Sequence, residues 1–200
     1  LDKLQNKQVS VLQIPSLEEL SIGKVSIDNL RPIKTEDLLG RDPIKIDPNP
    51  LKKEFSGKVI CITGAGGSIG SELCRQIVSF KPSVLLLLDI SEHNLYKINQ
   101  ELISIVGKET ELIPLLGDAT KNMFLEKIFS QRLINYVFHA AAYKHVPMVE
   151  INPLQGIFNN VFSTRNICKC AIKYGVEKVI LISTDKAVRP TNIMGASKRL

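Results

Sequence analysis

The sequence predicts an α/β fold of the Rossmann type, a doubly wound parallel sheet with helices on both faces. From residue 57 onward, short apolar runs alternate with segments whose apolar residues recur at helical spacing. Apolar runs without polar alternation are typical of strands that are buried on both faces of a parallel sheet. Right-handed crossovers between such strands give the doubly wound arrangement, in which ligands bind beyond the carboxyl ends of the strands.

Five strands and five helices are predicted in this part of the chain. The strands cover residues 58–63, 84–88, 112–116, 136–138 and 178–183. The first helix carries Ile69, Leu73, Ile77 and Phe80, and the second carries Leu95, Ile98, Leu102 and Ile105. A short helix covers residues 123–129, and a long one carries Leu154, Ile157, Val161, Cys168 and Ile172. Another helix begins near Met194.

Residues 1–50 have a different pattern. Residues 9–11 alternate like a short strand, and residues 17–20 could form one helical turn. Four prolines then interrupt the rest of this segment, at positions 32, 43, 48 and 50. We expect the tail of an upstream domain plus a linker here, and a C-terminally truncated Rossmann domain over residues 51–200. An N-terminal extension that packs on that domain is the alternative. Because the chain does not begin with Met, we expect a segment of a longer protein.

Composition limits the classes of function. With 44% hydrophobic residues, the chain can bury a sizeable core, and no apolar run is long enough to cross a bilayer. The net charge of +6 suits a solvated surface or an anionic ligand. No Lys/Arg-rich block interleaved with aromatic residues appears, so nucleic acid is not an expected partner. The four cysteines lack zinc-type spacing, so we expect reduced thiols and no metal site.

A glycine-rich turn follows the first predicted strand. Gly64, Gly67 and Gly70 fit the pattern G-x-x-G-x-x-G at the start of the first helix. Gly64 permits the tight turn, Gly67 allows the backbone to approach a pyrophosphate, and Gly70 lets the helix pack closely. Free N–H groups at the helix start, at Ser68 and Ile69, would face the anion.

Acidic residues end the next two strands and favour a dinucleotide. Asp89 lies 19 residues after Gly70 (89 − 70) and can accept hydrogen bonds from both ribose hydroxyls. The carboxylate would repel a 2′-phosphate, which favours NAD over NADP. Asp118 could reach the adenine amine or could simply form a turn. Ala119, Ala140 and Ala141 complete the expected cofactor contacts.

A polar cluster follows the fifth predicted strand. Residues 183–186 read Ser-Thr-Asp-Lys, and residues 194–198 read Met-Gly-Ala-Ser-Lys. This order resembles the extended short-chain dehydrogenase/reductase family, in which a Ser/Thr precedes a Tyr-x-x-x-Lys helix. The Lys is present as Lys198, whereas Met194 stands in the place of the Tyr.

Longer motifs narrow the resemblance. Residues 183–199, residues 139–148 (HAAAYKHVPM) and residues 31–41 (RPIKTEDLLGR) are similar to the capsule-type polysaccharide-biosynthesis branch of nucleotide-sugar 4,6-dehydratases. The chain is most similar to the large membrane-associated members that act on UDP-N-acetylglucosamine, several of which have Met in place of the Tyr. In those relatives, the segment equivalent to residues 31–41 joins an upstream Rossmann-like domain to the dehydratase domain.

The resemblance implies roles for the cluster. Thr184 would hydrogen-bond the sugar 4-hydroxyl, Asp185 would protonate the leaving C6 hydroxyl, and Lys186 would remove the C5 proton in its neutral form. Lys198 would hold the nicotinamide ribose. With Tyr absent, Thr184 together with Asp185, or a water, is our hypothesis for the group that takes the 4-hydroxyl proton.

Four further polar residues follow the fourth strand or lie in the long helix. Lys144 and Asn160 are candidate substrate contacts, although Asn160 could instead be a core residue bonded to the backbone. We expect His139 to be packed at a strand end and leave His145 open.

The implied function is NAD-dependent 4,6-dehydration of a UDP-N-acetylhexosamine for surface polysaccharide. The parent protein would be homo-oligomeric and held at the cytoplasmic face of the bacterial inner membrane by upstream segments. A 4-epimerase or a C5-inverting dehydratase of the same fold is the first alternative. A non-catalytic NAD-binding module is the second, because most substrate-binding residues of the family lie beyond residue 200.

Overall fold

The computed structural model describes residues 12–13, 31–32 and 47–200. The chain divides into two compact units, Leu1–Asp47 and Pro48–Leu200. In the first unit, β1 (Leu12–Gln13) pairs antiparallel with β2 (Arg31–Pro32). The predictions for residues 9–11, 17–20 and 43, and most of the 31–41 motif, lie outside the described residues.

The second unit begins with α4 (Pro48–Phe55), a helix that the sequence did not predict. Pro48 and Pro50 were expected to interrupt a linker. Both lie instead in the first turn of α4, where the backbone N–H groups have no helical partner, so a missing N–H costs nothing. Phe55 holds α4 to the sheet, because its ring packs edge-on against Tyr136 with a centroid separation of 5.2 Å.

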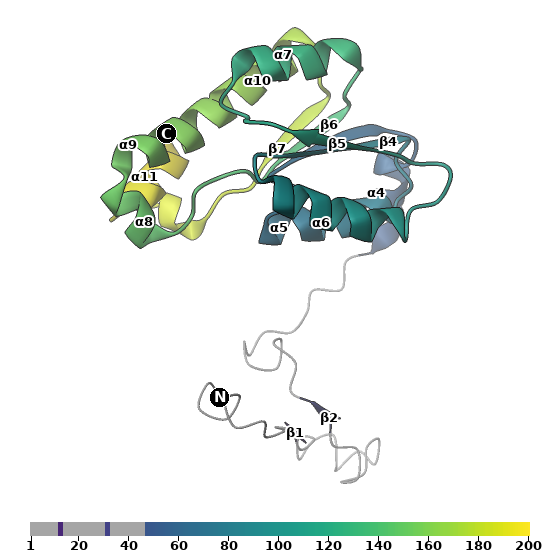
Figure 1. Ribbon diagram of the computed structural model, residues 1–200, viewed down its shortest axis with the longest axis horizontal. Helices are drawn as coiled ribbons and strands as arrows, with labels where there is room; N and C mark the ends of the chain where they lie inside the picture. Colours follow the sequence, from purple (N-terminus) through teal and green to yellow (C-terminus); the bar gives the residue numbers. More distant parts are fainter. Residues whose placement is uncertain (1–11, 14–30, 33–46) are drawn as a thin grey trace. The chain divides into compact units, whose positions relative to one another are not determined.

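A five-stranded parallel sheet forms the centre of the second unit (Figure 1). Its strands are β3 (Val59–Thr63), β4 (Val84–Asp89), β5 (Glu111–Leu116), β6 (Tyr136–His139) and β7 (Lys178–Leu181). They lie in the order β5-β4-β3-β6-β7, and each pairs in parallel with its neighbours. This order reverses direction at β3, which confirms the predicted doubly wound fold.

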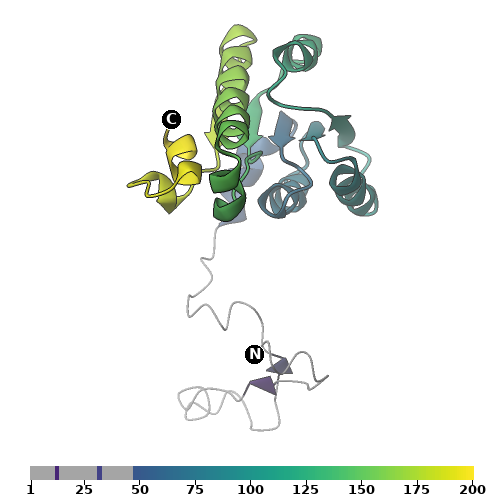
Figure 2. The same ribbon diagram turned by 60° about the vertical axis from the view of Figure 1, so that its left-hand side comes forward.

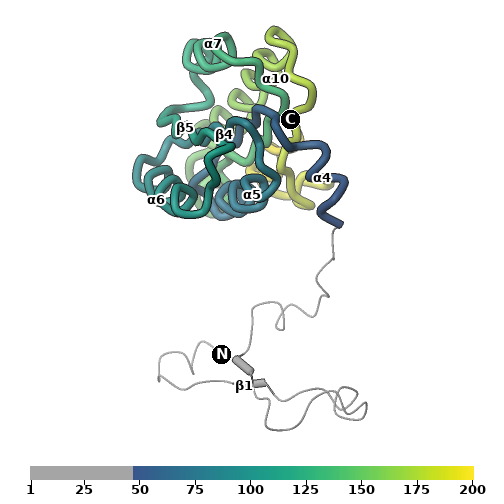
Figure 3. The backbone as a smooth tube through the Cα atoms, turned by 90° about the vertical axis from the view of Figure 1, so that its right-hand side faces the viewer, coloured from purple at the N-terminus to yellow at the C-terminus, as the bar shows by residue number. Residues whose placement is uncertain are grey.

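Helices cover both faces of the sheet (Figures 2 and 3). On one face lie α5 (Ser68–Val78) and α6 (Glu92–Ile103), and on the other lie α7 (Asn122–Gln131) and α10 (Ser163–Lys173). Side chains of β3 alternate between the two layers: Ile60 and Ile62 pack with α5 and α6, and Cys61 packs with α7 and α10. The strands therefore bury apolar side chains on both faces, as predicted for a parallel sheet.

The two edge strands depart from this prediction. Whereas β4 and β6 are buried along their whole length, β5 and β7 consist of exposed and half-buried residues. Edge strands have a neighbour on one side only, so helices shield them less completely. The second helix also ends earlier than predicted: Ile105 lies beyond α6 and is 57% exposed.

The predicted long helix consists of three consecutive segments: α9 (Pro153–Ile157), the π-helical η1 (Phe158–Phe162) and α10. The predicted buried face is wrong in part, because Leu154 and Ile172 are 79% and 85% exposed. The face that turns inward carries Gly156, Asn160, Ser163, Ile167 and Ala171.

Shorter elements gather beyond the carboxyl ends of β6 and β7. They are α8 (Val146–Ile151), the 3-10 turn η2 (Asp185–Ala187) and α11 (Ile193–Arg199). Figure 1 shows α8, α9 and α11 side by side at this end, where contacts join α11 to both of the others. The sequence predicts α11 but not α8.

Candidate active site

Gly64 and Gly70, in the turn after β3, leave no room for a side chain. Gly64 has a positive φ of 65°, and a Cβ there would lie 2.8 Å from the backbone of Ala141. A Cβ on Gly70 would overlap the carbonyl oxygen of Gly64, so this glycine lets α5 approach the turn itself. The turn, the start of α5 and the loop after β6 are therefore in backbone contact.

The amino end of α5 is open to a ligand. Gly67 precedes the helix, is exposed, and has no side chain that could cap the first N–H groups. A helix start without a side-chain cap keeps N–H groups available to an anion such as a pyrophosphate. Ser68 and Ile69 begin the helix and are exposed.

Asp89 joins the end of β4 to the glycine turn. Its Oδ2 accepts a hydrogen bond of 2.8 Å from the backbone N–H of Gly66, and its Oδ1 accepts one of 2.8 Å from the Ser91 N–H. The residue is only 7% exposed, so these bonds fix the direction of the carboxylate. Each oxygen can accept a further hydrogen bond, as from a sugar hydroxyl.

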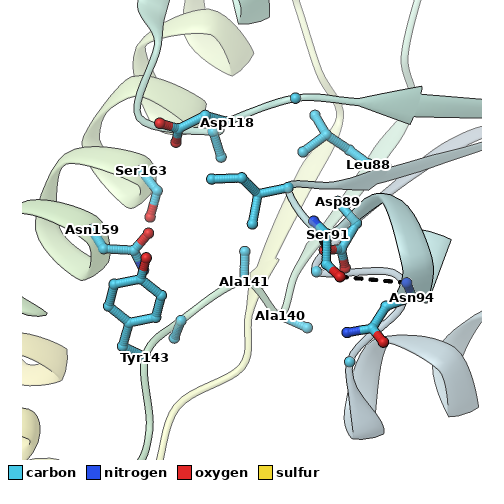
Figure 4. Close-up of a pocket in the computed structure, with 16 residues that line it drawn as sticks. Leu88, Asp89, Ser91, Asn94, Asp118, Ala140, Ala141, Tyr143, Asn159 and Ser163 are labelled. Carbon is cyan, nitrogen blue, oxygen red and sulfur yellow. Dashed lines mark hydrogen bonds between the residues drawn. The ribbon is translucent and has the colours of Figure 1, made fainter. Parts of the chain in front are cut away.

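A cavity of about 280 Å³ lies between the glycine turn and the ends of β4, β5 and β6 (Figure 4). Its lining includes seven predicted cofactor contacts: Gly64, Gly67, Asp89, Asp118, Ala119, Ala140 and Ala141. It also includes residues that the sequence did not predict: Leu88, Ile90, Ser91, Asn94, Gly117, Ala142, Tyr143, Asn159 and Ser163. Ser91 and Asn94 could have been found, because Ser91 caps α6 directly after Asp89 by accepting from the Asn94 N–H. The predicted contacts Ser68, Ile69 and Gly70 do not line this cavity.

The residues of this cavity fit a dinucleotide. Small and apolar side chains make a slot for a base, the Asp89 carboxylate suits ribose hydroxyls, and the α5 start suits a pyrophosphate. Asp118 lines the opposite wall in Figure 4, and its Oδ1 accepts a 2.8 Å hydrogen bond from the Thr120 N–H. Asp118 is therefore both a cavity residue and a turn-forming residue.

A buried hydrogen-bonded chain connects β3 to the long helix. Thr63 Oγ1 lies 2.7 Å from His139 Nδ1, and His139 Nε2 lies 3.0 Å from Thr164 Oγ1. Because Thr164 donates its own proton to the Asn160 carbonyl at 2.8 Å, His139 donates from Nε2 and accepts at Nδ1. His139 is 1% exposed, which confirms the expected packed histidine. Burial, and secondarily the charge of Lys198, lowers its pKa to about 4.

Asn160 holds two loops together from inside the π-helical segment. Its Oδ1 accepts from the Tyr143 N–H at 2.8 Å, and its Nδ2 donates to the Tyr143 carbonyl at 3.0 Å. Nδ2 also donates to Ser197 Oγ in α11 at 2.8 Å. The amide is 3% exposed and fully engaged with protein groups, which is the core role that the sequence left open for it.

The Thr-Asp-Lys triplet follows β7 at the same sheet end as the glycine turn, since β3, β6 and β7 are parallel neighbours. Thr184 Oγ1 donates to Asp185 Oδ1 at 3.0 Å, and the Lys186 N–H donates to the same oxygen at 2.9 Å. Both hydrogen bonds lower the pKa of Asp185, and the one from Thr184 has the larger effect. Asp185 is therefore ionised near neutral pH. Lys186 is exposed, so the described residues do not bury it as a neutral base would require.

The start of α11 packs against this triplet. Asn192 caps the helix by accepting from the Gly195 N–H at 2.8 Å, and a Cβ on Gly195 would overlap the Lys186 carbonyl oxygen. Met194 is 3% exposed. Lys198 is half-buried, and this burial lowers its pKa.

The triplet, Lys144 and Lys198 do not line the glycine-turn cavity. Lys198 lines a second cavity of about 340 Å³ together with Asn160, Thr164 and Arg165. Lys144 and His145 are exposed and line a third, of about 400 Å³, beside α8 and α9. The structure thus gathers seven of the predicted cofactor contacts in one cavity, whereas Lys198 and the predicted catalytic groups lie on neighbouring elements at the same end of the sheet.

The described part of the chain shows neither a metal centre nor a membrane span. Within residues 47–200 and the short described strands, no three His, Cys, Asp or Glu side chains cluster as metal ligands do, and all four cysteines are free. None of the described helices has both the length and the hydropathy that crossing a bilayer needs.

The chain is similar to proteins of polysaccharide synthesis. The capsular polysaccharide biosynthesis protein CapD of Staphylococcus aureus is 41% identical over 192 residues, 96% of this chain and 32% of CapD. A UDP-glucose 4-epimerase of Rickettsia canadensis is 35% identical over 149 residues, 73% of this chain and 42% of that protein. The inverting UDP-N-acetylglucosamine 4,6-dehydratase of Campylobacter jejuni is 33% identical over 145 residues, 72% of this chain and 41% of that protein.

Solved structures share the fold. Pen from Bacillus thuringiensis superposes with a TM-score of 0.66 at 33% identity, over 72% of this chain and 43% of that chain. The chain spans about a third of the length of CapD and less than half of the other relatives. The model of the family described as polysaccharide biosynthesis protein matches residues 60–200, so the chain belongs to this family, whose members are similar to nucleotide-sugar dehydratases and epimerases.

Proposed function

We propose that the parent protein catalyses NAD-dependent 4,6-dehydration of a UDP-N-acetylhexosamine, with UDP-N-acetylglucosamine as substrate. The observation that carries this proposal is the cavity in which Asp89 is bonded to the glycine turn at the open start of α5. A carboxylate at this position accepts ribose hydroxyls and repels a 2′-phosphate, which favours NAD over NADP. The 33% identity to the Campylobacter dehydratase supports the substrate class, and the 41% identity to CapD supports a role in capsular polysaccharide synthesis.

Bound NAD⁺ would supply a hydride acceptor for sugar C4 and return the hydride to C6. The protein must then manage the protons. We assign Asp185, once it has taken up a proton, as the acid for the departing C6 hydroxyl, Lys186 as the base at C5 and Thr184 as the partner of the 4-hydroxyl. Lys198 would hold the nicotinamide ribose. Substrate that covers Lys186 would supply the burial needed for its neutral form.

Other roles fall to the surrounding loops. Lys144 is exposed beside a cavity, and we propose it as a contact for the substrate. Asn160 has all its polar groups engaged, so we propose that it positions the Tyr143 loop and α11 and affects substrate only through them. We also propose that upstream segments attach the parent protein to the inner membrane and that the parent protein forms a homo-oligomer.

A 4-epimerase is the second candidate, because the Rickettsia relative is as similar as the dehydratase. A 4-epimerase has no C6 hydroxyl to expel and needs no acid–base pair such as Asp185 and Lys186. The family's Tyr, which 4-epimerases usually keep, is replaced here by Met194. The sequence therefore favours the dehydratase.

Product analysis of the full-length protein tests the choice. With UDP-N-acetylglucosamine in D₂O, a dehydratase gives a 4-keto-6-deoxy sugar with a C6 methyl group and deuterium at C5. A 4-epimerase gives the C4 epimer with protium at C5. The same reaction in H₂O, followed by borohydride reduction of the 4-keto group, gives H4–H5 couplings that distinguish retention from inversion at C5. Full dehydratase activity in both Asp185→Asn and Lys186→Ala would contradict the assigned acid–base pair.

A further inference from the structure

Helix α11 is too short to fix its own direction. It has seven residues, and a helix of this length is not stable by itself in water, so contacts with other elements hold its axis. One such contact lies near its end, where Ser197 Oγ accepts from Asn160 Nδ2 at 2.8 Å. Another, from Arg199 to the Val188 carbonyl at 2.7 Å, joins α11 only to the loop that leads into it. A fixed axis therefore needs a further anchor near the start of the helix.

Glu150 of α8 provides a bond at this start. Its Oε1 accepts from the Ile193 N–H at 2.6 Å, across 43 positions of the sequence. Ile193 is the first residue of α11, so its N–H has no partner within the helix. The Asn192 cap leaves this group unbonded, because its side chain accepts from the Gly195 N–H instead. Glu150 thus ties the first residue of α11 to another element.

Helix α8 is a firm base for this bond. Val149, the neighbour of Glu150, is buried, and a Cβ on Gly156 would lie 2.5 Å from its Cγ1, so α8 packs closely on α9. The first turn of α11 contains no acidic residue that could replace Glu150. Gly195 has no room for a side chain. The carboxylate at this helix start therefore comes from a distant part of the chain.

We propose that Glu150 is a positioning residue, which holds the start of α11 and so sets the direction from which Lys198 reaches the nicotinamide ribose. The inference rests on the role proposed for Lys198. Because Lys198 does not line the glycine-turn cavity, its ammonium group reaches a bound cofactor only in the direction that α11 gives it. Glu150 lines none of the three cavities described above, so it acts through α11 and does not contact the cofactor.

Two nucleotides separate this role from a general effect on stability. ADP has the adenine, one ribose and the diphosphate, which are the groups that the glycine-turn cavity fits. NAD adds the nicotinamide ribose, which Lys198 would hold. A displaced α11 should therefore weaken the binding of NAD and leave the binding of ADP unchanged, whereas a destabilised fold would weaken both.

Calorimetry on the full-length protein measures both affinities. Glu150→Ala should raise the dissociation constant of NAD roughly three- to tenfold, which is the effect of one hydrogen bond, and leave that of ADP unchanged. Glu150→Gln keeps an acceptor oxygen at the same reach and should bind both nucleotides as the wild type does. Glu109→Ala is the matched control, because it removes an exposed carboxylate that is bonded to Lys81 at 2.6 Å, before the start of β5.

Hydrogen exchange examines the helix directly. Residues 193–196 should exchange faster in Glu150→Ala than in the wild type or in Glu150→Gln, whereas residues 64–70 should exchange equally in all three. Unchanged exchange at the start of α11, or equal losses of NAD and ADP affinity in Glu150→Ala, would overturn the positioning role. Glu150→Gln that behaves like Glu150→Ala would also overturn it, because the charge of Glu150 rather than its bond would then matter.

Lys198→Ala separates this inference from the proposed function. It should lower NAD affinity and spare ADP affinity, as Glu150→Ala does. If Lys198→Ala shows this selective loss and Glu150→Ala does not, the positioning role alone is wrong. If neither variant shows it, the role proposed for Lys198 is wrong and the positioning role is wrong with it.

Discussion

The backbone N–H of Gly66 donates to Asp89 Oδ2 at 2.8 Å, so the glycine turn after β3 and the acidic end of β4 form one bonded unit. The two residues are 23 positions apart in the sequence. Their contact places a carboxylate beside the open start of α5, so a ribose and a pyrophosphate could be bound next to each other.

Replacing Asp89 with Asn should weaken NAD binding. The amide cannot accept through both of its polar atoms, so hydrogen bonds to Gly66 or Ser91, and to a ribose hydroxyl, are lost. A charge-assisted hydrogen bond contributes about 1.5–3 kcal/mol, so the dissociation constant should rise roughly ten- to 100-fold. Calorimetry with NAD measures the effect. Glu92→Gln, the same chemical change at an exposed residue of α6, is the control and should bind NAD as wild type does.

Replacing Gly70 with Ala should lower both stability and NAD affinity. The new methyl group would overlap the Gly64 carbonyl and force α5 away from the turn, at a cost of about 1–3 kcal/mol. Gly175→Ala is a matched control, since Gly175 has a φ of 69° with nothing within 4 Å of a new Cβ. That variant should lose stability by about 1–2 kcal/mol through strain and keep its NAD affinity. Equal NAD affinity in the two variants would contradict this account of Gly70.

Acid should destabilise the protein through His139. The folded pKa of about 4 lies below the usual value of 6.5, so the unfolded chain binds more protons between these values. The stabilisation is complete above pH 6.5 and is lost as the pH falls towards 4, by on the order of 3 kcal/mol. Urea unfolding at pH 7 and pH 5 measures it. His139→Gln should show a smaller loss between the two pH values, whereas His93→Gln, at an exposed site, should match the wild type.

Replacing Asn160 with Leu should destabilise the loop after β6 and the start of α11 together. The variant leaves the Tyr143 N–H and carbonyl and the Ser197 hydroxyl without their partner, which costs roughly 2–3 kcal/mol. Urea unfolding gives the total, and hydrogen exchange should show faster opening at residue 143. Gln100→Leu, at an exposed position of α6, should change stability by less than about 0.5 kcal/mol. Equal free energies of unfolding in the two variants would contradict the role assigned to Asn160.

The sequence predicts the sheet and the cofactor cavity well because both depend on local patterns. The turn at Gly64–Gly70 requires glycine for steric reasons that are visible in the spacing alone, and Asp89 ends a strand whose five preceding residues are apolar. Ligand sites of doubly wound sheets lie at the carboxyl ends of strands. A predicted strand that is followed by glycines or by an acidic residue therefore locates the ligand site.

The long helix shows where such reasoning fails. The usual expectation is that the apolar face of a helix turns inward. Here the inward face carries Gly156, Asn160 and Ser163, because these residues approach a neighbour closely or bond to it. The partners of Asn160 lie 17 and 37 positions away, and no local pattern contains them. Helix α4 was not predicted because its two prolines were interpreted as interruptions. Proline interrupts a helix in its middle but is compatible with its first turn.

Gly195 has a mechanical consequence. A Cβ at this position would overlap the Lys186 carbonyl oxygen, so η2 and the start of α11 can stay this close only while residue 195 is glycine. A larger side chain would push the Thr-Asp-Lys turn and the helix that carries Lys198 apart. The spacing between these two groups therefore depends on a residue that has no reactive group of its own.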